Sequence, residues 1–276
     1  MDRRTTPFSG RVAHVSLRGQ VEAPLTAGEP ALVLQPVVDL LASPDGARDR
    51  QLLLGAAVTV IDRDRGHAFV RAERDGYCGW VAAAAVGPGP EPTHWVASPG
   101  THLYPEPRVQ ARERAGISLG SRLAVLAMGD TWAETPLGHV PASHLRALSQ
   151  PAIDAVAVAE SLLGTPYLWG GNSRQGIDCS GLVQLALHAT GRDCPGDSDQ
   201  QQALGRRLAA DEALQRGDLI FWKGHVAMVV DDLRLIHANG HSMSVAYEGI
   251  TAAIDRIARS GAAGTGGGPV LARQRP

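Results

Sequence analysis

The chain has 276 residues, of which 44% are hydrophobic and 20% charged, a composition typical of a globular protein with room for two or three domains. The formal net charge is −2 and no basic cluster is present, which excludes the strongly basic surface of a nucleic-acid-binding protein. No apolar run reaches the ~20 residues that a membrane-spanning helix needs. We therefore expect neither nucleic acid nor membrane as a partner.

The cysteine content and the start of the chain indicate a reducing compartment. Cys78, Cys179 and Cys194 are an odd number of cysteines, which argues against a disulfide framework. The first residues carry positive charge but lack the apolar core of a secretory signal. We expect a cytoplasmic protein, and a monomer is the default expectation because the sequence does not fix the oligomeric state.

The first half of the chain has the pattern of small all-β domains. After an N-terminal extension over residues 1–30, short apolar-rich runs alternate with Gly, Pro and Asp turns, as is typical of strands. These runs cover residues 33–41, 57–61, 68–71 and 78–81. The Gly- and Pro-rich residues 87–92 then predict a stiff linker.

Part of this pattern recurs beyond the linker. Residues 54–60 align with residues 119–125, and Gly79-Trp80-Val81 aligns with Gly138-His139-Val140. A repeat of small strand-rich units predicts two tandem barrels, at residues 31–86 and 93–148. One continuous β-domain is the alternative.

The pattern changes after Pro151. Residues 153–163 and 180–190 have the apolar spacing of amphipathic helices, each followed by a glycine, and a polar helical stretch lies near 200–204. Apolar strands separated by turns follow at 218–222, 226–230 and 233–237. Helices followed by an antiparallel meander predict an α+β domain over residues 152–276, with a loose segment at 259–268 and an edge strand at 270–272.

Cys179 lies where a Gly-rich loop gives way to a helix. The positive end of a helix favours the thiolate, which is the nucleophilic form of cysteine. A histidine on a neighbouring strand, His225, can act as its base if that strand packs against the helix. His237 would lie beside His225 in a hairpin, where it can orient the imidazole. The pattern is that of a cysteine hydrolase.

At these positions the sequence resembles the NlpC-type cysteine peptidases, a papain-like family that cuts bacterial cell-wall peptides. The resemblance covers about residues 153–247 and rests on four motifs in order. They are Tyr167-Leu168-Trp169-Gly170-Gly171, Asp178-Cys179-Ser180-Gly181-Leu182, residues 216–228 with His225, and Ile236-His237-Ala238. The resemblance implies a papain-like α+β fold and a peptidase without a cofactor.

The resemblance also implies roles for individual residues. Cys179 would be the nucleophile, His225 the general base and acid, and His237 the orienting residue. Tyr167 would face the nucleophile and, with backbone N–H groups at the helix start, help to stabilise the oxyanion. The positions that line the substrate cleft in the family correspond to Asp178, Ser180, Asp197 and Ser198. Gly196 departs from the pattern, because the family more often has Arg there.

The N-terminal repeats resemble bacterial Src-homology-3-like domains. The first matches well, whereas the second has His139 where the family usually has Trp. This domain order is most similar to that of the γ-D-glutamyl-L-diamino acid endopeptidases, whose first barrel recognises a free N-terminal L-Ala. Tyr77 matches the barrel tyrosine used there, and Asp49 is one candidate for the barrel acid. The implied substrate is a murein tripeptide or tetrapeptide met in cell-wall recycling, with either meso-diaminopimelate or lysine at its third position.

Three alternatives stay open from the sequence. Cys179, His225, His237 and His241 could hold zinc, although the short-spaced ligand pairs of structural zinc sites are missing. The same papain-like frame could serve an amidase or acyltransferase on another acyl substrate. The chain could also be a cell-wall binding protein with a vestigial catalytic domain, against which the complete set of predicted catalytic residues argues.

Overall fold

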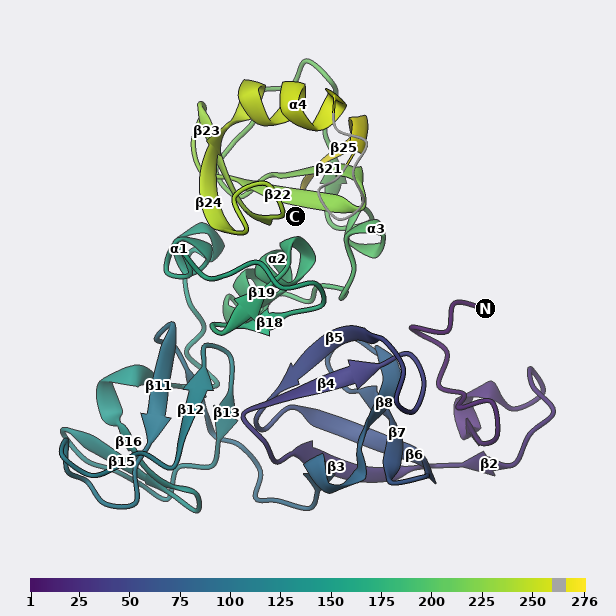
Figure 1. Cartoon of the computed structure of the whole chain (residues 1–276), viewed down its shortest axis with the longest axis vertical. Coiled ribbons are helices and arrows are strands. Elements are labelled where there is room, and N and C mark those ends of the chain that lie inside the picture. The colour runs from purple at the N-terminus through teal and green to yellow at the C-terminus, as the bar shows by residue number, and fades with distance from the viewer. Residues whose placement is uncertain (260–266) are drawn as a thin grey trace. The chain divides into compact units, whose positions relative to one another are not determined.

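The computed structural model of the chain describes residues 1–259 and 267–276. Two compact units, Met1–Gln150 and Pro151–Pro276, are drawn in Figure 1. The division lies where the sequence pattern changes from short strands to helices. Most of the predicted loose segment falls at 260–266, outside the described residues.

Residues 29–87, here called the first β-module, contain an antiparallel seven-stranded sheet in the order β5-β4-β8-β7-β6-β3-β9. Its strands are β3 Glu29–Val33, β4 Val37–Leu41, β5 Arg48–Leu53, β6 Ala57–Asp64, β7 His67–Ala72, β8 Cys78–Ala82 and β9 Val86–Gly87, with the 3-10 turn η2 Ala83–Ala85 before β9. Alternate residues such as Val58, Val60 and Val70 fill one core. The predicted run 33–41 is split in two, and Pro36, which has no N–H to donate to a sheet, lies in the gap.

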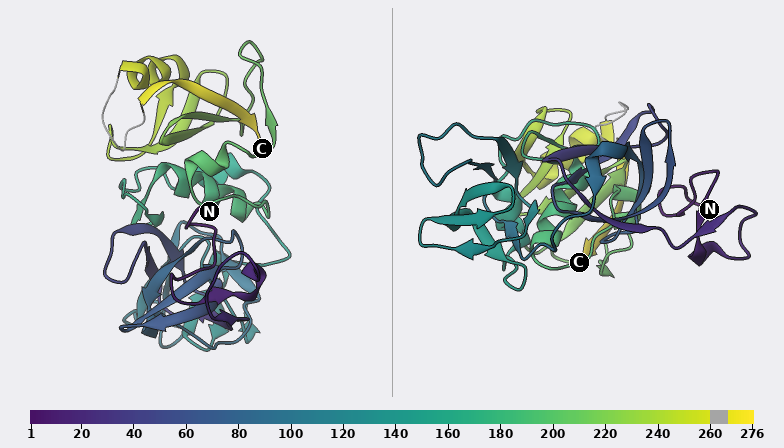
Figure 2. Two further views of the ribbon diagram at one scale, coloured as in Figure 1. Left: turned by 90° about the vertical axis from the view of Figure 1, so that its right-hand side faces the viewer. Right: turned by 90° about the horizontal axis from the view of Figure 1, so that it is seen from below.

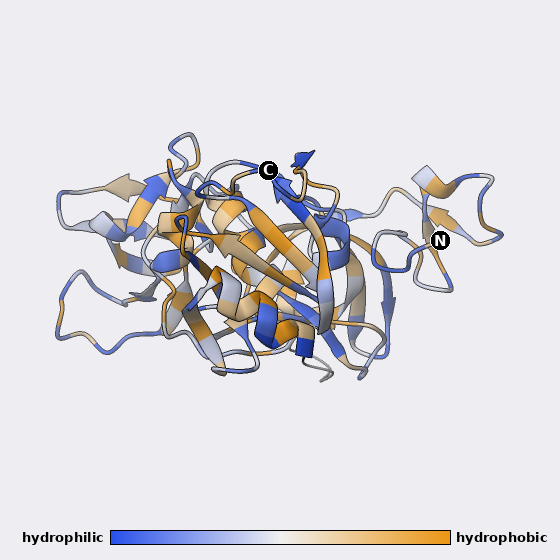
Figure 3. Cartoon of the chain, turned by 90° about the horizontal axis from the view of Figure 1, so that it is seen from above, coloured by the Kyte–Doolittle hydropathy of each residue, from blue (hydrophilic) through white to orange (hydrophobic). Residues whose placement is uncertain are grey.

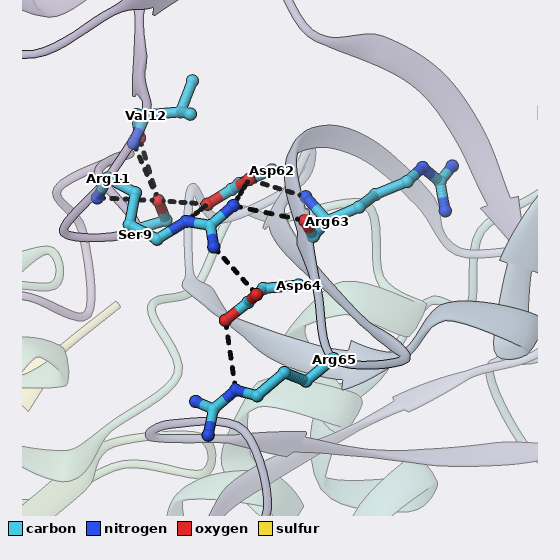
Figure 4. A network of polar contacts seen from close by, with 7 residues as sticks. All are labelled: Ser9, Arg11, Val12, Asp62, Arg63, Asp64 and Arg65. Carbon is cyan, nitrogen blue, oxygen red and sulfur yellow. Dashed lines mark hydrogen bonds and ion pairs between the residues drawn. The ribbon is translucent and has the colours of Figure 1, made fainter.

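The N-terminal residues are packed onto this module rather than extended from it. They contain β1 Ala13–His14, η1 Val15–Leu17 and β2 Leu25–Thr26. The Ser9 hydroxyl donates to Asp62 at 2.7 Å, and the Arg11 guanidinium binds Asp62 and Asp64 of β6, as Figure 4 shows. Val12 packs against a second apolar cluster made of Ile61, Phe69, Cys78 and Trp80. The predicted extension is therefore part of the module's packing, and its last two residues already belong to β3.

Residues 94–147, the second β-module, form three small sheets. Their strands are β10 His94–Val96, β11 Gly100–Leu103, β12 Ala115–Ser118, β13 Arg122–Leu123, β14 Ala127–Met128, β15 Trp132–Thr135, β16 Gly138–Pro141 and β17 Leu145–Ala147, with η3 Ala142–His144 before β17. The core contains Val96, Ile117 and Val140, and Leu54 of the first module is packed into it. The two modules thus share a packed seam within the first unit.

The two modules share a pattern of backbone hydrogen bonds. In the first, the Gly55 N–H donates to the carbonyl of Val33, and in the second the Gly120 N–H donates to that of Val96. Both glycines have positive φ, +75° and +85°, which glycine adopts without strain. Each module ends with a strand, a 3-10 turn and a second strand: β8, η2 and β9 in the first module, and β16, η3 and β17 in the second. The tandem-barrel form stays a prediction that this repeated bonding supports.

The second unit begins with short helices around a two-stranded hairpin. The elements are α1 Ala155–Glu160, β18 Asn172–Ser173, β19 Gly176–Ile177, α2 Cys179–Ala189 and α3 Ser198–Gln201. Asp154 caps α1 by accepting a hydrogen bond from the Val156 N–H at 2.8 Å. Ile153 was expected on the apolar face of this helix, but it precedes the cap and is 99% exposed.

A six-stranded sheet in the order β20-β25-β21-β22-β23-β24 forms the rest of the unit. Its strands are β20 Arg206–Arg207, β21 Leu219–Lys223, β22 His225–Val229, β23 Arg234–Asn239, β24 Ser244–Gly249 and β25 Gly267–Arg275. Helix α2 lies on one side of this sheet and α4 Ile250–Arg259 on the other, as Figures 1 and 2 show. The central strands are hydrophobic over much of their length (Figure 3), as expected for a sheet covered on both faces.

Strands β20 and β24 and helix α4 were not predicted, and strand β25 differs from its prediction. Strand β24 and helix α4 follow the predicted strand at 233–237; Ala253 and Ile257 of α4 are buried against the sheet. The predicted edge strand at 270–272 is part of the longer β25. Strand β20 pairs with β25, so β20 and not β25 lies at the edge of the sheet. The α+β class of the unit follows from these elements.

Candidate active site

Cys179 is the first residue of α2, and Asp178 is the N-cap of that helix. The Asp178 carboxylate accepts hydrogen bonds from the Gly181 N–H at 2.7 Å, from the Ser180 hydroxyl at 3.0 Å and from the Gly170 N–H at 2.9 Å. One side chain therefore both caps the helix and ties it to the preceding turn. This arrangement fixes the position of the cysteine at the head of the helix.

The glycines of the two motifs are needed because this turn lies against the helix. A Cβ on Gly181 would lie 2.5 Å from the carbonyl oxygen of Gly171, and a Cβ on Gly171 would lie 2.5 Å from that of Gly176. Asp178 and Ser180 were predicted to line the substrate cleft. The structure instead uses the Asp178 carboxylate and the Ser180 hydroxyl to build the helix start, which leaves their predicted contact with substrate a prediction.

The thiol of Cys179 lies in a buried environment, with 7% of the residue exposed. The backbone N–H groups of Val226, Ser180 and Cys179 itself favour the thiolate. Burial, together with the negative charge of Asp178, outweighs them and raises the pKa of the thiol from 9.0 to about 12. The sequence predicts a lowered pKa from the helix end together with a nearby imidazole; the pKa in this structure is raised instead, because desolvation is the larger effect.

His225 is the first residue of β22 and is fully buried. It precedes Val226, whose N–H acts on the Cys179 sulfur, so the structure brings the head of α2 to the head of this strand. Burial, and next the positive charge of His237 when protonated, lower the pKa of His225 to about 3. Its Nδ1 is buried and has no hydrogen-bond partner among the described residues. A ring nitrogen is thus available for proton transfer.

The second ring nitrogen of His225 is held by His237 of β23. His225 Nε2 and His237 Nδ1 lie 2.9 Å apart, in a fully buried hydrogen bond. His237 Nε2 in turn lies 3.1 Å from Oε2 of Glu248, which the Arg256 guanidinium binds through two hydrogen bonds of 2.8 Å. This contact between His237 and Glu248 becomes an ion pair only when His237 is protonated.

These shifts define the resting state of the pair. The thiol has a raised pKa and the imidazole a lowered one, so both groups are neutral at pH 7. Burial disfavours the charged form of each group. A thiolate then arises when the thiol proton passes to the imidazole as a substrate carbonyl is attacked. The arrangement can carry out nucleophilic acyl transfer with His225 as general base and acid.

Tyr167 lies in the segment before β18, half-buried. Its N–H donates to the Met243 carbonyl at 2.9 Å, and its backbone pairs with Ile177 next to the helix start. Burial raises the pKa of its hydroxyl, and the charges of Cys179 and Asp178 raise that pKa further. The phenol is therefore neutral at pH 7, and its role beside the nucleophile stays a prediction.

The loop with Asp197 and Ser198 is fixed to the helix that carries the cysteine. Asp197 is the N-cap of α3, Ser198 is its first residue, and both are half-buried. The fully buried Gln201 donates from Nε2 to the carbonyl of Ser180 at 3.0 Å. Burial raises the pKa of Asp178, and the negative charge of Asp197 raises it further. This end of the site is acidic.

Comparison with known proteins decides the family. Residues 164–256 match the model of the NlpC/P60 family. The chain is 31% identical over 234 residues to a gamma-D-glutamyl-L-lysine dipeptidyl-peptidase of Bacillus cereus, an alignment that covers 71% of this chain and 69% of that protein. The chain belongs to the NlpC/P60 family. It is an enzyme of the cysteine peptidase type that defines this family.

Further comparisons extend the NlpC/P60 assignment beyond the catalytic unit. Residues 40–86 match the model described as a bacterial dipeptidyl-peptidase Sh3 domain. A dipeptidyl-peptidase 6 of Lysinibacillus sphaericus is 25% identical over 76% of this chain and 87% of its own length. The crystal structure of an NlpC/P60 family protein from Bacillus cereus has the same fold, with a TM-score of 0.74 at 22% identity, over 90% of this chain and 99% of that one.

Tyr77 and Asp49, predicted to act from the first barrel of this NlpC/P60 protein, lie in the first unit. Tyr77 is 2% exposed, and the Cζ atom of Arg50 lies 5.1 Å from the centroid of its ring. Arg50 also pairs with Asp75. Asp49 accepts two hydrogen bonds from Arg3, at 2.5 and 2.8 Å. An internal partner thus occupies Asp49, which weakens its assignment as the barrel acid, and the substrate role of Tyr77 stays a prediction.

Sequence reasoning missed two residues of the NlpC/P60 site, Glu248 and Arg256. The resemblance ends at Tyr247, and an acid in a strand followed by an Arg in a helix carries no motif. A signal was available in the alternation of β24, in which Glu248 shares a face with the residue opposite His237. It could be read only once the register with β23 was known.

Two remaining expectations concern metals and membranes. Among the described residues, no group of three or more His, Cys, Asp or Glu side chains is placed to hold a metal ion. Within residues 1–259 and 267–276, no helix has the length and apolar character needed to cross a membrane.

Proposed function

We propose that the protein is a cysteine endopeptidase that hydrolyses the γ-D-glutamyl–diamino acid bond of murein peptides with a free N-terminal L-Ala. The observation that carries this proposal is the buried hydrogen bond between His225 and His237. His225 begins β22, and the N–H of the next residue, Val226, acts on the sulfur of Cys179 at the start of α2. The choice of bond is supported by the name of the Bacillus cereus relative, which is a gamma-D-glutamyl-L-lysine dipeptidyl-peptidase.

The chemistry follows the order that the buried pair allows. The thiol proton passes to His225 as sulfur attacks the γ-carbonyl carbon of D-Glu, forming a C–S bond and an oxyanion. In this proposal the N–H groups at the head of α2 and the neutral hydroxyl of Tyr167 stabilise that oxyanion. His225 then protonates the leaving amine as the C–N bond breaks. Water, activated by His225, hydrolyses the thioester and restores the thiol.

Selection for a free amine has a physical basis in the acidic end of the site. The negative charge of Asp197 acts on Asp178 there, and an ammonium group would relieve the repulsion between the two charges. A longer or acylated peptide presents a neutral amide instead and would leave a carboxylate without its counter-charge. We propose that Asp197 and Ser198 contact the N-terminal L-Ala, and that the substrate is a tripeptide or tetrapeptide already released from the wall.

A free amine on L-Ala is present only after the peptide has been cut from the glycan, so we also propose that the enzyme acts in recycling, in the cytoplasm. All three cysteines are free and buried, which suits a reducing compartment.

The test is a panel of substrates analysed by mass spectrometry. We expect cleavage of L-Ala-γ-D-Glu-meso-diaminopimelate or its lysine analogue, and at least ~10²-fold slower cleavage of the N-acetylated peptide. Asp197→Asn should reduce this preference mainly through a higher KM, with Asp193→Asn in the loop before it as the matched control. Equal rates on free and acetylated peptides would overturn the amine selection. If every peptide stays intact, the peptidase itself is contradicted, and an acyl ester or thioester is the substrate to test next.

A further inference from the structure

The contacts of His237 continue beyond the histidine pair into a charged pair that has no assigned role. Glu248 lies 3.1 Å from His237 Nε2, and Arg256 binds both carboxylate oxygens of Glu248. His237 is 1% exposed, whereas the side chains of Glu248 and Arg256 are 19% and 20% exposed. The result is a continuous path from Arg256 near the surface to the buried His225.

The fold places these groups together through strand register. His237 of β23 lies opposite Ala246 of β24, and Glu248 follows two residues later on the same face. A long side chain at this diagonal position can reach a ring on the neighbouring strand. Helix α4 begins directly after β24 and turns back over the sheet, which brings Arg256 above Glu248.

The charge of Glu248 decides which ring nitrogens carry protons. A carboxylate accepts hydrogen bonds and cannot donate one, so the nitrogen that faces it must carry the proton. His237 is then protonated on Nε2, which leaves its Nδ1 as an acceptor. The 2.9 Å bond therefore has His225 Nε2 as donor, and the lone pair of His225 lies on Nδ1. The opposite order would point a lone pair of His237 at the carboxylate.

We propose that Glu248, held by Arg256, is a positioning residue that fixes the tautomers of His237 and His225 and so leaves Nδ1 of His225 as the base for Cys179. The hydrogen bonds from Arg256 keep the pKa of Glu248 well below its usual range, so the carboxylate is charged whenever the enzyme works. The inference rests on the proposed role of His225 as base, but it does not depend on which peptide is cut.

Glu248 and Arg256 have opposite effects on the pKa values of the two histidines, so their removal gives opposite predictions. Glu248 raises the pKa of His225 and of His237, and Arg256 lowers both. The other titratable groups around them are His241, whose charge lowers the pKa of His237, and Cys179 on α2. Removing Arg256 should therefore favour the imidazolium, whereas removing Glu248 should disfavour it.

The first test reads the tautomers directly, by nitrogen-15 NMR of the histidine rings in the whole 276-residue chain. His225→Gln and His237→Gln variants assign the two rings. We expect Nε2–H on both in the native protein. In Glu248→Gln, Arg256 claims the amide oxygen and leaves the amide NH₂ facing His237, so both rings should switch to Nδ1–H. Unchanged tautomers in Glu248→Gln would overturn the proposal.

The second test is the pH dependence of kcat. Glu248→Gln should lower kcat by about 10²-fold or more with little change in KM, because the base is then protonated at the wrong nitrogen. Arg256→Gln should move the acid limb of kcat upward by about half a pH unit or more, and Arg256→Lys should restore it. Glu212→Gln is the matched control, since Glu212 pairs with Arg206 and Arg275 away from the histidines.

The outcomes separate this proposal from the proposed function. If the native protein cuts no murein peptide, the NMR result still decides whether Glu248 sets the tautomers. If the peptide is cut but Arg256→Gln leaves the acid limb in place or moves it downward, the positioning role fails while the peptidase stands. Loss of fold, seen as a lost NMR spectrum in Glu248→Gln, would leave Arg256→Gln and Arg256→Lys as the deciding pair.

Discussion

At the scale of single residues, burial is the dominant influence on the catalytic pair. The helix start and the nearby N–H groups favour the Cys179 thiolate, yet the pKa of the thiol is raised to about 12 by burial. The pKa of His225 falls to about 3 for the same reason. Each group has lost its water and neither has gained enough opposite charge in return. The pair is therefore expected to rest as thiol and neutral imidazole.

This resting state predicts a broad pH profile. Activity requires His225 unprotonated and Cys179 as the proton donor, so the acid limb of kcat should lie below pH 6.5 and the alkaline limb above pH 9.0. The measurement is kcat at saturating peptide, because the substrate amine itself titrates near pH ~8 and would distort kcat/KM. A narrow bell centred between pH 5 and 7, typical of a preformed thiolate–imidazolium pair, would contradict this account.

At the scale of elements, the start of α2 depends on the single side chain of Asp178. It accepts hydrogen bonds from the N–H groups of Gly181 and Gly170, which would lose their partner in Asp178→Ala. Burial raises the pKa of Asp178 because it disfavours the charged carboxylate, and these hydrogen bonds stabilise that charge in return. The cap thus couples the stability of the helix start to the position of the nucleophile.

We expect Asp178→Ala to lower the free energy of unfolding by about 2 kcal/mol and to reduce kcat at least ~10-fold, measured by denaturant unfolding and peptide turnover. Asp154→Ala is the matched control, because Asp154 caps α1 through the Val156 N–H and binds Arg216 rather than the segment around Cys179. It should lower stability by about 1 kcal/mol and leave kcat unchanged. Equal loss of kcat in both variants would show that the cap does not position Cys179.

The motif-bearing elements were predictable from sequence because their local patterns are strong. Helix α2, the strand of His225 and the strand of His237 lie where apolar spacing and turn residues predict them. Glu248 and Arg256 were not predictable, because their role depends on the register of β24 against β23 and on the return of α4 over the sheet. The raised pKa of Cys179 was also missed, since burial is a property of the packed fold and not of the motif.

At the scale of the whole molecule, two units of different architecture form the chain, and the buried histidines tie the stability of the second to pH. The pKa of His225 and that of His237 are both lowered in the fold, mainly by burial. In the unfolded chain both would take up protons as the pH falls below 6.5. The unfolded state then binds more protons than the folded state, so acid must destabilise the fold.

We expect the free energy of unfolding of the second unit to fall by up to roughly 1.4 kcal/mol per pH unit through His225 between pH 6.5 and 4.5, and His237 should add to this fall in the same direction. Above pH 9.0 the raised pKa of Cys179 should lower it again. Calorimetry across this range measures the effect. His225→Gln should flatten the acid side, whereas His188→Gln, which removes the half-buried His188 of α2, serves as control. Identical acid slopes in native protein and His225→Gln would contradict the assignment.

The most direct test of the central claim compares native enzyme with Cys179→Ala on L-Ala-γ-D-Glu-meso-diaminopimelate, following products by mass spectrometry. The account predicts the dipeptide L-Ala-D-Glu and free diaminopimelate from the native enzyme, none from Cys179→Ala, and turnover reduced at least ~10³-fold in Cys179→Ser, because an alkoxide is harder to form than a thiolate. Native-like turnover by Cys179→Ala would contradict it, and so would folded native enzyme that leaves both this tripeptide and its lysine analogue intact.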